Sequence, residues 1–225
     1  MRRYLAVFFV LALQVSAVHA GVPDSSMAAI DSTFSLDKHE VTSAQFAAFL
    51  NAKGNQREGN ASWVELGTLF SLIEEKDGHF VPKQGFEHHP VIEVSWEGAK
   101  AYCQWAGKRL PTEDEWSLAC AGAEPRTYPW GEELAEGRAN LAGDKDGFVR
   151  TAPVGTFPQG ASPQEIMDLA GNVWEWTAAD SAAVAHLRGG SWANGTSMAK
   201  CVVRATVSSA HSYIKSNSVG FRCAR

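Results

Sequence analysis

The stretch VSWEGAKAYCQWAGKRLPTEDEWSLACAG, residues 94–122, has the most regular pattern in this chain of 225 residues. Its first half predicts a helix that begins after Ser95, whose side-chain oxygen can accept hydrogen bonds from the first free amides. The helix is expected to end at Gly107, because glycine tolerates the backbone conformation that follows a helix. The helical period places Tyr102 and Cys103 on its inner, apolar face.

The second half of the stretch predicts another helix. Thr112 and Glu115 form a T-x-x-E capping box after a proline, and Trp116 and Cys120 share the inner face. Each helix therefore turns a cysteine toward the interior, where a disulfide or an inert buried thiol is favoured over a reactive one.

The regions on either side of this stretch differ in regularity. Residues 40–54, EVTSAQFAAFLNAKG, predict a short amphipathic helix capped at Thr42 or Ser43. Residues 69–75 and 78–86 predict two strands joined by an Asp-Gly turn. After the second cysteine-bearing helix the chain shows little periodicity, so its backbone groups need loop-specific partners, including bound ions.

The N-terminus has the pattern of an export signal. Arg2 and Arg3 form a basic start, an apolar run follows, and small residues near Ala20 suit cleavage. We therefore expect residues 1–20 to be a signal peptide and residues 21–32 an N-terminal tail of a periplasmic or secreted protein. No later apolar stretch is long enough to span a bilayer, so no membrane span is expected after the signal is removed.

Charge and length limit the class of partner. Removal of residues 1–20 takes two arginines and no acids from the 20 basic and 25 acidic side chains, which changes the net charge from −5 to −7. This balance argues against a nucleic-acid partner, because binding to phosphates requires basic patches. The remaining length suits one hydrophobic core, and we expect a single domain and a monomer.

Four cysteines lie in the part expected to be exported. An even count in an oxidising compartment favours two disulfides, but the spacing alone leaves all three pairings open. No C-x-x-C occurs, so the sequence does not support a zinc-ribbon or thioredoxin-like protein. The four residues are Cys103, Cys120, Cys201 and Cys223.

Two segments of the irregular half have the oxygen ligands that calcium prefers. Asn140, Asp144 and Asp146 surround a glycine-rich turn, although an ordinary Asp-rich turn would look the same. Asp168 and Glu175 flank a glycine and a tryptophan, so a tight loop could bring both carboxylates to one ion. Two such carboxylates could also act as a glycosidase acid and base, but the sequence does not fix their separation.

Other catalytic signatures are weak. The seven histidines do not cluster, and His88 and His89 would point to opposite faces of a strand. No G-x-S-x-G, Walker loop, dinucleotide fingerprint or H-E-x-x-H occurs. Hydrolase and nucleotide-dependent activities are therefore disfavoured.

Five phrases in order resemble the formylglycine-generating enzyme family, also called the sulfatase-modifying factor domain. They are LDKHEVTSAQFAAFL, HPVIEVSWEGAKAYCQWAGKRLPTEDEWSLACAG, YPWG, LAGNVWEWT, and RGGSW followed by VGFRCAR. The resemblance covers residues 33–225. It implies an α+β fold, namely a single compact irregular domain of the C-type-lectin-like type with little regular secondary structure.

The resemblance also implies disulfides and metal sites. It pairs Cys103 with Cys223 and Cys120 with Cys201. It implies two structural calcium ions and matches eight positions to their ligands. For the first ion these are Asn140 and Asp146 through side chains and Leu141 and Phe148 through carbonyls; for the second they are Asp168 and Glu175 through side chains and Gly171 and Val173 through carbonyls.

The sequence departs from the founding enzyme of this family, which uses copper held by two cysteines to oxidise a cysteine of unfolded sulfatases. Its two thiolate ligands follow the G-G-S within the interval that here reads WANGTSMAK, which contains no cysteine. Because thiolates select Cu(I), we expect no copper and no formylglycine-generating oxidase activity.

Three functional hypotheses remain open, because the sequence does not decide whether the protein is an enzyme. The first is an exported accessory or maturation factor that binds or modifies an exported protein or peptide-derived product at a cleft near Trp174, Ser191, Trp192 and Asn194. The second is a lectin-like display module that diversifies residues 192–219. The third is a thiol-free enzyme of siderophore or cofactor maturation, with Ser191 or His211 as catalytic candidates and Glu175 as a further proton-handling group.

Overall fold

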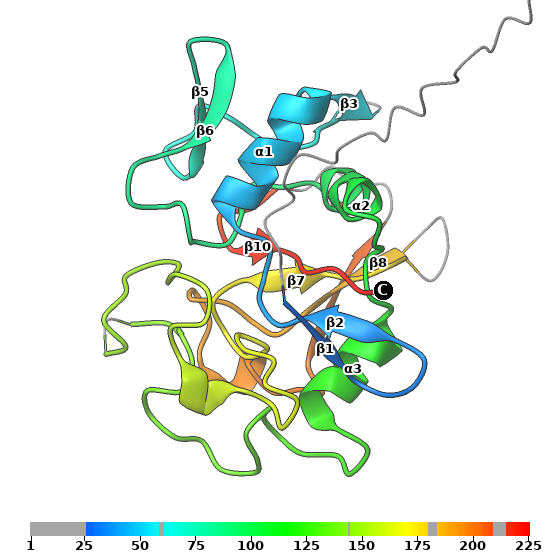
Figure 1. Cartoon of the computed structure of the whole chain (residues 1–225). Helices are drawn as coiled ribbons and strands as arrows, with labels where there is room; N and C mark the ends of the chain where they lie inside the picture. The colour runs from blue at the N-terminus through cyan, green and yellow to red at the C-terminus, as the bar shows by residue number, and fades with distance from the viewer. Residues whose placement is uncertain (1–25, 59–60, 144, 180–183, 209–214) are drawn as a thin grey trace, which may run out of the picture.

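Residues 26–58, 61–143, 145–179, 184–208 and 215–225 are described by the computed structural model. Short helices and strands in this part are connected by long loops around one four-stranded sheet (Figure 1). The predicted α+β class with little regular secondary structure is confirmed. The predicted signal peptide, Asp144 and His211 lie outside the described residues.

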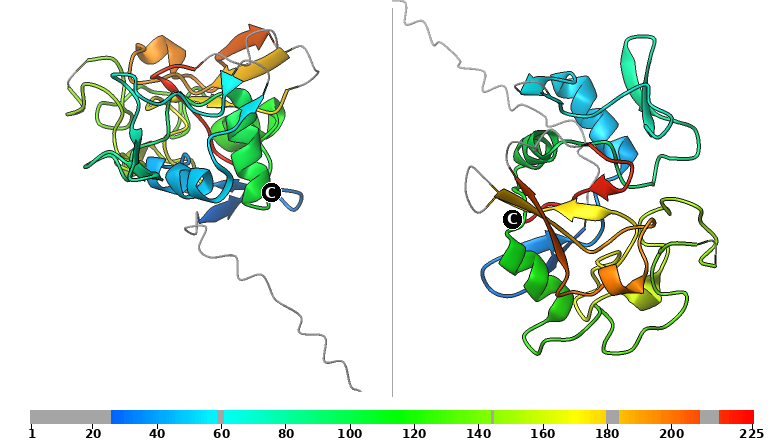
Figure 2. Two further views of the ribbon diagram at one scale, coloured as in Figure 1. Left: turned by 90° about the horizontal axis from the view of Figure 1, so that it is seen from above. Right: turned by 180° about the vertical axis from the view of Figure 1, so that it is seen from behind.

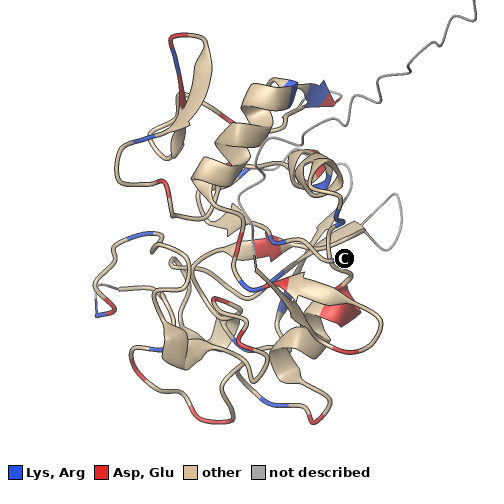
Figure 3. Ribbon diagram, in the orientation of Figure 1, with Lys and Arg blue, Asp and Glu red and all other residues tan. Residues whose placement is uncertain are grey.

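All three predicted helices are present. Their N-caps accept hydrogen bonds as the sequence predicts: Thr42 and Thr112 each form a complete capping box, and the Ser95 hydroxyl accepts from the amide of Gly98. The first turn of α3 carries three acidic residues, which interact favourably with the helix dipole (Figure 3). The helices are α1 (Ser43–Lys53), α2 (Trp96–Trp105) and α3 (Glu113–Ala121).

Among the described residues, three small antiparallel hairpins and two 3₁₀ turns lie outside the main sheet. The predicted Asp-Gly turn joins β5 and β6, where Asp77 and Gly78 have φ of 53° and 77°, as a tight hairpin turn requires. The hairpins are β1 (Met27–Ala29) with β2 (Ser35–Asp37), β3 (Arg57–Glu58) with β4 (Ala61–Ser62), and β5 (Ile73–Lys76) with β6 (His79–Pro82); the 3₁₀ turns are η1 (Pro158–Gly160) and η2 (Thr196–Met198).

The prediction of a tail over residues 21–32 is wrong in its last part. Residues 27–29 form β1, which pairs with β2, and the Ala28 side chain is buried beside Leu36 and Trp116. A three-residue strand has too short a pattern to be recognised alone, and its burial depends on α3, which lies far along the chain.

The main sheet has the strand order β10-β7-β8-β9, with β10 parallel to β7 and the other neighbours antiparallel. Helices α1 and α2 lie on one side of this sheet, and α3 and the long loops lie on the other (Figures 1 and 2). Its strands are β7 (Trp174–Trp176), β8 (Val184–Arg188), β9 (Arg204–Ser208) and β10 (Val219–Gly220).

Two buried apolar clusters fill the two sides. The larger one packs α1 and α2 against the sheet, and its centre is a group of aromatic rings with centroids 4.9–6.0 Å apart. The smaller one surrounds Trp116 of α3 and includes Ile166 and Leu169. The rings of the larger cluster belong to Phe46, Phe49, Trp63, Tyr102 and Phe221.

Both disulfides that the resemblance implies are confirmed. Cys103 of α2 is bonded to Cys223 near the C-terminus, and Cys120 of α3 is bonded to Cys201. The bridges join residues 120 and 81 positions apart, so each could add about 4–5 kcal/mol of stability on the chain-entropy model. Two disulfides are consistent with an extracytoplasmic location. Within the described ranges, no helix combines the length and apolar character needed to cross a membrane.

Candidate functional site

Strand β7 separates apolar from polar side chains. Successive residues of a strand point to opposite faces, so Trp174 and Trp176 join the aromatic cluster while Glu175 points toward α3. Strand β8 follows the same rule, because Leu187 packs with the aromatic cluster and its neighbour Arg188 faces α3. The α3 side of the sheet, called the polar side below, therefore carries the charged side chains of these strands next to the smaller apolar cluster.

The Glu175 carboxylate is fully buried on this side and is held by three donors. Arg222 donates from Nε to Oε2 and from Nη2 to Oε1, both at 2.7 Å, and the Trp116 indole donates to Oε2 at 2.8 Å. Arg222 is itself fully buried and also donates to the carbonyls of Asp37 and Met167. Such a bidentate pair compensates for the loss of water around both charges.

Two further buried carboxylates accompany this pair. Glu40 accepts from Asn172 Nδ2 at 2.7 Å and from the amide of Val173 at 3.3 Å. Burial raises the pKa of Glu40 well above its usual range, and the charges of Asp168 and Glu175 raise it further. Burial likewise raises the pKa of Asp168 to about 6, although the amide of Gly155 donates to it at 2.7 Å.

Three carboxylates and one guanidinium leave this buried cluster with an excess of negative charge when all four groups are ionised. A divalent cation would remove that excess, so Asp168 fits the predicted second calcium site. Glu175 fits it less completely, since both lone pairs of Oε2 are engaged and only Oε1 can accept another partner. Asp168 also has φ of 60°, a left-handed backbone conformation that is strained for residues other than glycine. Such a conformation persists only where the surrounding structure enforces it.

The predicted first calcium loop is closed by Asp146. Its Oδ2 accepts from the amide of Leu141 at 2.8 Å, and its Oδ1 accepts from the amide of Phe148 at 3.0 Å. Asn140 is buried, and its Nδ2 donates to the carbonyl of Arg150 at 2.8 Å and to Asn172 Oδ1 at 3.0 Å. These two bonds fix the orientation of the amide.

The Asn140 side-chain oxygen is consequently buried without a hydrogen-bond partner. Unpartnered buried oxygens are rare and call for a ligand, so Asn140 fits a cation site. Across the described residues, no group of three or more His, Cys, Asp or Glu side chains is arranged to hold a metal ion. Both predicted sites would thus depend on backbone oxygens, and among the described residues no backbone amide donates to the predicted carbonyl ligands of Leu141, Phe148, Gly171 and Val173.

The two loops are in direct contact. Gly171 has φ of 83°, and a Cβ atom there would lie 2.3 Å from the carbonyl oxygen of Asn140, so only glycine fits. Asn172 donates its amide to the same carbonyl at 2.9 Å, and its side chain bridges Glu40 and Asn140. An ion in one loop would therefore affect the order of the other.

The predicted ligand surface lies just beyond these loops. Asn194 organises it: Oδ1 accepts from the Trp174 indole at 2.8 Å and from the Ser191 hydroxyl at 2.7 Å. The Asn194 carbonyl accepts from the amide of Ala142 at 2.9 Å, which ties the surface to the first calcium loop. The Trp192 indole donates to the carbonyl of Asn217 at 3.0 Å. Three of the four residues predicted for the cleft therefore share hydrogen bonds, and Trp192 follows Ser191 in the chain.

Exposure differs among these four residues. Ser191 is fully buried and its hydroxyl serves Asn194, so the described geometry gives Ser191 a positioning role rather than that of an accessible nucleophile. Trp192 and Asn194 are half-buried, and Asn194 Nδ2 donates to no described group. Every cysteine is in a disulfide. The surface thus offers an amide donor and an indole, groups suited to binding.

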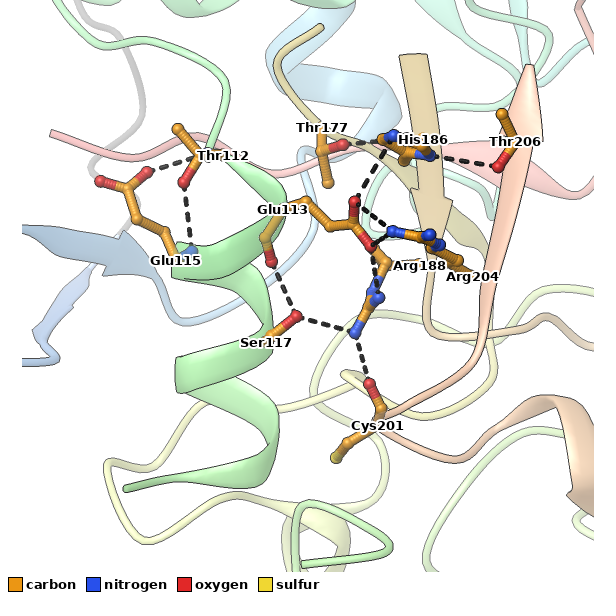
Figure 4. A network of polar contacts seen from close by, with 10 residues as sticks. All are labelled: Thr112, Glu113, Glu115, Ser117, Thr177, His186, Arg188, Cys201, Arg204 and Thr206. Atoms are coloured by element: carbon orange, nitrogen blue, oxygen red, sulfur yellow. Dashed lines mark hydrogen bonds and ion pairs between the residues drawn. The ribbon is translucent and has the colours of Figure 1, made fainter. Parts of the chain in front are cut away.

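A network of polar contacts anchors the start of this loop. Arg188 precedes the two glycines and donates to Glu113 Oε1 and to the Ser117 hydroxyl, both at 2.8 Å (Figure 4). It also donates to the carbonyl of Cys201, so it joins both ends of the segment 189–201. Arg204 approaches the Glu113 carboxylate at 3.2 Å. Arg188 and the Cys120–Cys201 disulfide therefore both hold the segment 189–201 in place.

Several residues of this site were not predicted. Glu40, Arg188 and Arg222 lie within the family phrases, but the sequence alone indicates no role for them. Their partners lie far along the chain; for example, Glu40 and Asn172 are 132 positions apart. A charged residue next to a hydrophobic strand, as in RGGSW and GFRC, is the signal that could have marked the two arginines.

Comparison with known proteins identifies the family of the chain. The model of the sulfatase-modifying factor enzyme 1-like domain matches residues 14–225. The chain belongs to this sulfatase-modifying factor family. Among its relatives, the inactive C-alpha-formylglycine-generating enzyme 2 of Bos taurus is 42% identical over 154 residues, which cover 60% of this chain and 50% of the relative. The formylglycine-generating enzyme of Mus musculus is 35% identical over 181 residues, which cover 64% and 48%.

Solved structures show the same fold. PvdO from Pseudomonas aeruginosa superposes with a TM-score of 0.65 at 22% identity, and the match covers 85% of this chain and 80% of that one. This sulfatase-modifying factor domain spans only part of the curated relatives that it matches, from 22% to 60% of their length. Family membership therefore assigns the fold, while the activity of a whole relative is not transferred.

Proposed function

We propose that this protein is an exported accessory or maturation factor that binds an exported protein or peptide-derived product. The contact surface consists of the half-buried Trp192 and Asn194, and the buried Trp174 and Ser191 hold Asn194 in place. The observation that supports this proposal is the combination of an ordered loop with the use of all four cysteines in disulfides. A copper oxidase of this family needs a thiolate pair in the same loop, whereas binding needs only the ordered surface.

The surface is preorganised for binding. Asn194 Oδ1 is fixed by two donors, so its Nδ2 points in a defined direction and can donate to a carbonyl of a bound chain. Trp192 is held through its indole N–H, which leaves part of the ring exposed. A rigid aromatic ring beside a fixed amide donor favours binding, because these side chains lose little conformational entropy when a ligand binds.

The test uses purified exported proteins encoded by the genes that adjoin this one. Biolayer interferometry should detect binding of at least one of them to the wild-type protein. Trp192→Ala should weaken that binding by roughly thirtyfold, as expected for a central tryptophan of an interface. Val202→Ala is the matched control, since Val202 is an apolar residue with 79% exposure outside this surface. Absence of binding by every such protein, or equal binding by Trp192→Ala, would overturn the proposal.

We further propose that two calcium ions order the loops beneath this surface. Asn140 and Asp146 would hold one ion and Asp168 and Glu175 the other, with backbone carbonyls completing each shell. The unpartnered Asn140 oxygen and the buried acidic cluster support this assignment. When bound, the ions would supply positive charge to the loops. Elemental analysis of the purified protein after exhaustive dialysis should find about two calcium ions per chain and no copper.

A further inference from the structure

A small hollow lies beside the proposed ligand surface and is not used by it. Its volume is about 90 Å³, and its lining includes Leu69, Phe70, Lys83, Phe86, Arg150 and Asn217. The Asn217 carbonyl accepts from the Trp192 indole, so the hollow and the ligand surface share a wall. The loop after β6 and the loop near residue 150 approach each other at this place (Figure 1).

The hollow gathers apolar side chains that are open to solvent. Leu69 is 91% exposed and Phe86 is 36% exposed, while Ile92 is buried beneath them. Single exposed apolar residues are common on protein surfaces, but apolar residues grouped around a concave site are typical of a binding site. The size of the hollow suits one aliphatic side chain.

Two cations border the hollow without acidic partners. Within the part of the chain that the structure describes, neither Lys83 nor Arg150 forms an ion pair. The Arg150 guanidinium lies 4.8 Å from the centre of the Phe70 ring, which holds it over the apolar surface. The lining contains no acidic residue. In a chain with a net charge of −5, two unpaired cations at one hollow indicate an anionic ligand.

We propose that this hollow binds a peptide segment in which an apolar side chain is followed by a carboxylate. The apolar side chain would enter between Leu69 and Phe86, and the carboxylate would contact Lys83 and Arg150. This inference rests on the proposed function, because it assigns a sequence preference to the same bound polypeptide. The occupant is a peptide rather than a lipid, since the hollow holds one side chain and not a long acyl chain.

Asn140 connects this site to the first predicted calcium loop. Its Nδ2 donates to the backbone carbonyl of Arg150. This hydrogen bond does not involve the Arg150 side chain. Arg150→Gln therefore removes the charge and keeps the backbone bond. The variant is suitable for a test in which the fold must remain intact.

The test measures binding of two tetrapeptides blocked at both ends, which differ only in having leucine followed by aspartate or by asparagine. A chemical-shift titration of the disulfide-bonded protein should show that the aspartate peptide binds more tightly than the asparagine peptide. Each of the two cations should contribute about a threefold difference in affinity, as for exposed ion pairs. Peaks of residues around the hollow should shift, which locates the site.

The variants separate the two parts of the proposal. Arg150→Gln and Lys83→Gln should each reduce the preference for aspartate by about threefold, and Lys76→Gln, at an exposed lysine of β5, should leave it unchanged. Leu69→Ser should weaken both peptides by roughly fivefold, while Val202→Ser at another exposed position should have no effect.

The outcomes also separate this inference from the proposed function. Equal binding of both peptides, or a preference that survives Arg150→Gln and Lys83→Gln together, would overturn the inference even if a protein partner still requires Trp192. Specific peptide binding that depends on Arg150, combined with partner binding that is indifferent to Trp192→Ala, would support the hollow and refute the ligand surface.

Discussion

The two sides of the main sheet are stabilised in different ways. On the α1 and α2 side, aromatic rings such as Phe46 and Tyr102 pack with centroids 5.7 Å apart and bury apolar surface. On the α3 side, Glu175 and Arg222 are fully buried, and each needs its partner. The stability contributed by apolar packing depends little on pH or ions. The stability of the polar side should respond to both, because each buried charge there is stable only while its partners are present and ionised.

The largest effect is expected from Arg222→Met. It would leave the Glu175 carboxylate buried without its guanidinium and should lower the free energy of unfolding by about 3–5 kcal/mol. Urea denaturation measures this loss. Arg225→Met is the control, because Arg225 is exposed at the C-terminus and should cost less than about 0.5 kcal/mol. A similar small loss for both variants would mean that the buried pair does not stabilise the polar side.

Removal of calcium should have the next largest effect. If the free ion concentration is ten times the dissociation constant, chelation would lower the free energy of unfolding by about 1.4 kcal/mol per site, or about 2.8 kcal/mol for the two sites. Thermal denaturation with and without a chelator measures this difference. The loss of stability caused by Phe46→Ala should be the same with and without the chelator, since Phe46 lies in the aromatic cluster and not in the proposed calcium loops. Equal melting temperatures with and without the chelator would count against the calcium sites.

A smaller effect is expected from pH in the calcium-free protein. The pKa of Asp168 is about 6 in the folded state against 3.8 as its ordinary value, so the folded state binds the proton more tightly. Stability should therefore rise as pH falls through 6, by about 1–2 kcal/mol between pH 7.5 and pH 5. Asp168→Asn should remove this part of the pH dependence. A wild-type profile that coincides with that of Asp168→Asn would contradict the assignment.

The smallest effect concerns a helix cap. Thr112→Ala removes the hydroxyl that accepts from the Glu115 amide and should cost about 1 kcal/mol. The cost should not change when calcium is removed, because the capping bonds are local to α3. Serine at the same position should restore most of the loss, and a cost that depends on calcium would show that the cap is coupled to the buried acids.

The sequence predicts local features well and distant partnerships poorly. Helix α3 follows from Thr112 and Glu115 because its cap and its apolar face lie within ten residues of one another. Strand β1 was missed because its pairing depends on residues outside its own short pattern. The contact between Glu175 and Arg222 joins positions 47 residues apart, and periodicity carries no information about it. The disulfide pairing was available only through the family resemblance.

The central claim is that this domain keeps the architecture of its family while its cysteines serve structure instead of oxidation. The most direct test is intact-mass, thiol and metal analysis of the native protein. The account predicts two disulfides, no titratable thiol, about two bound calcium ions and no copper. A titratable thiol pair with bound copper would contradict it.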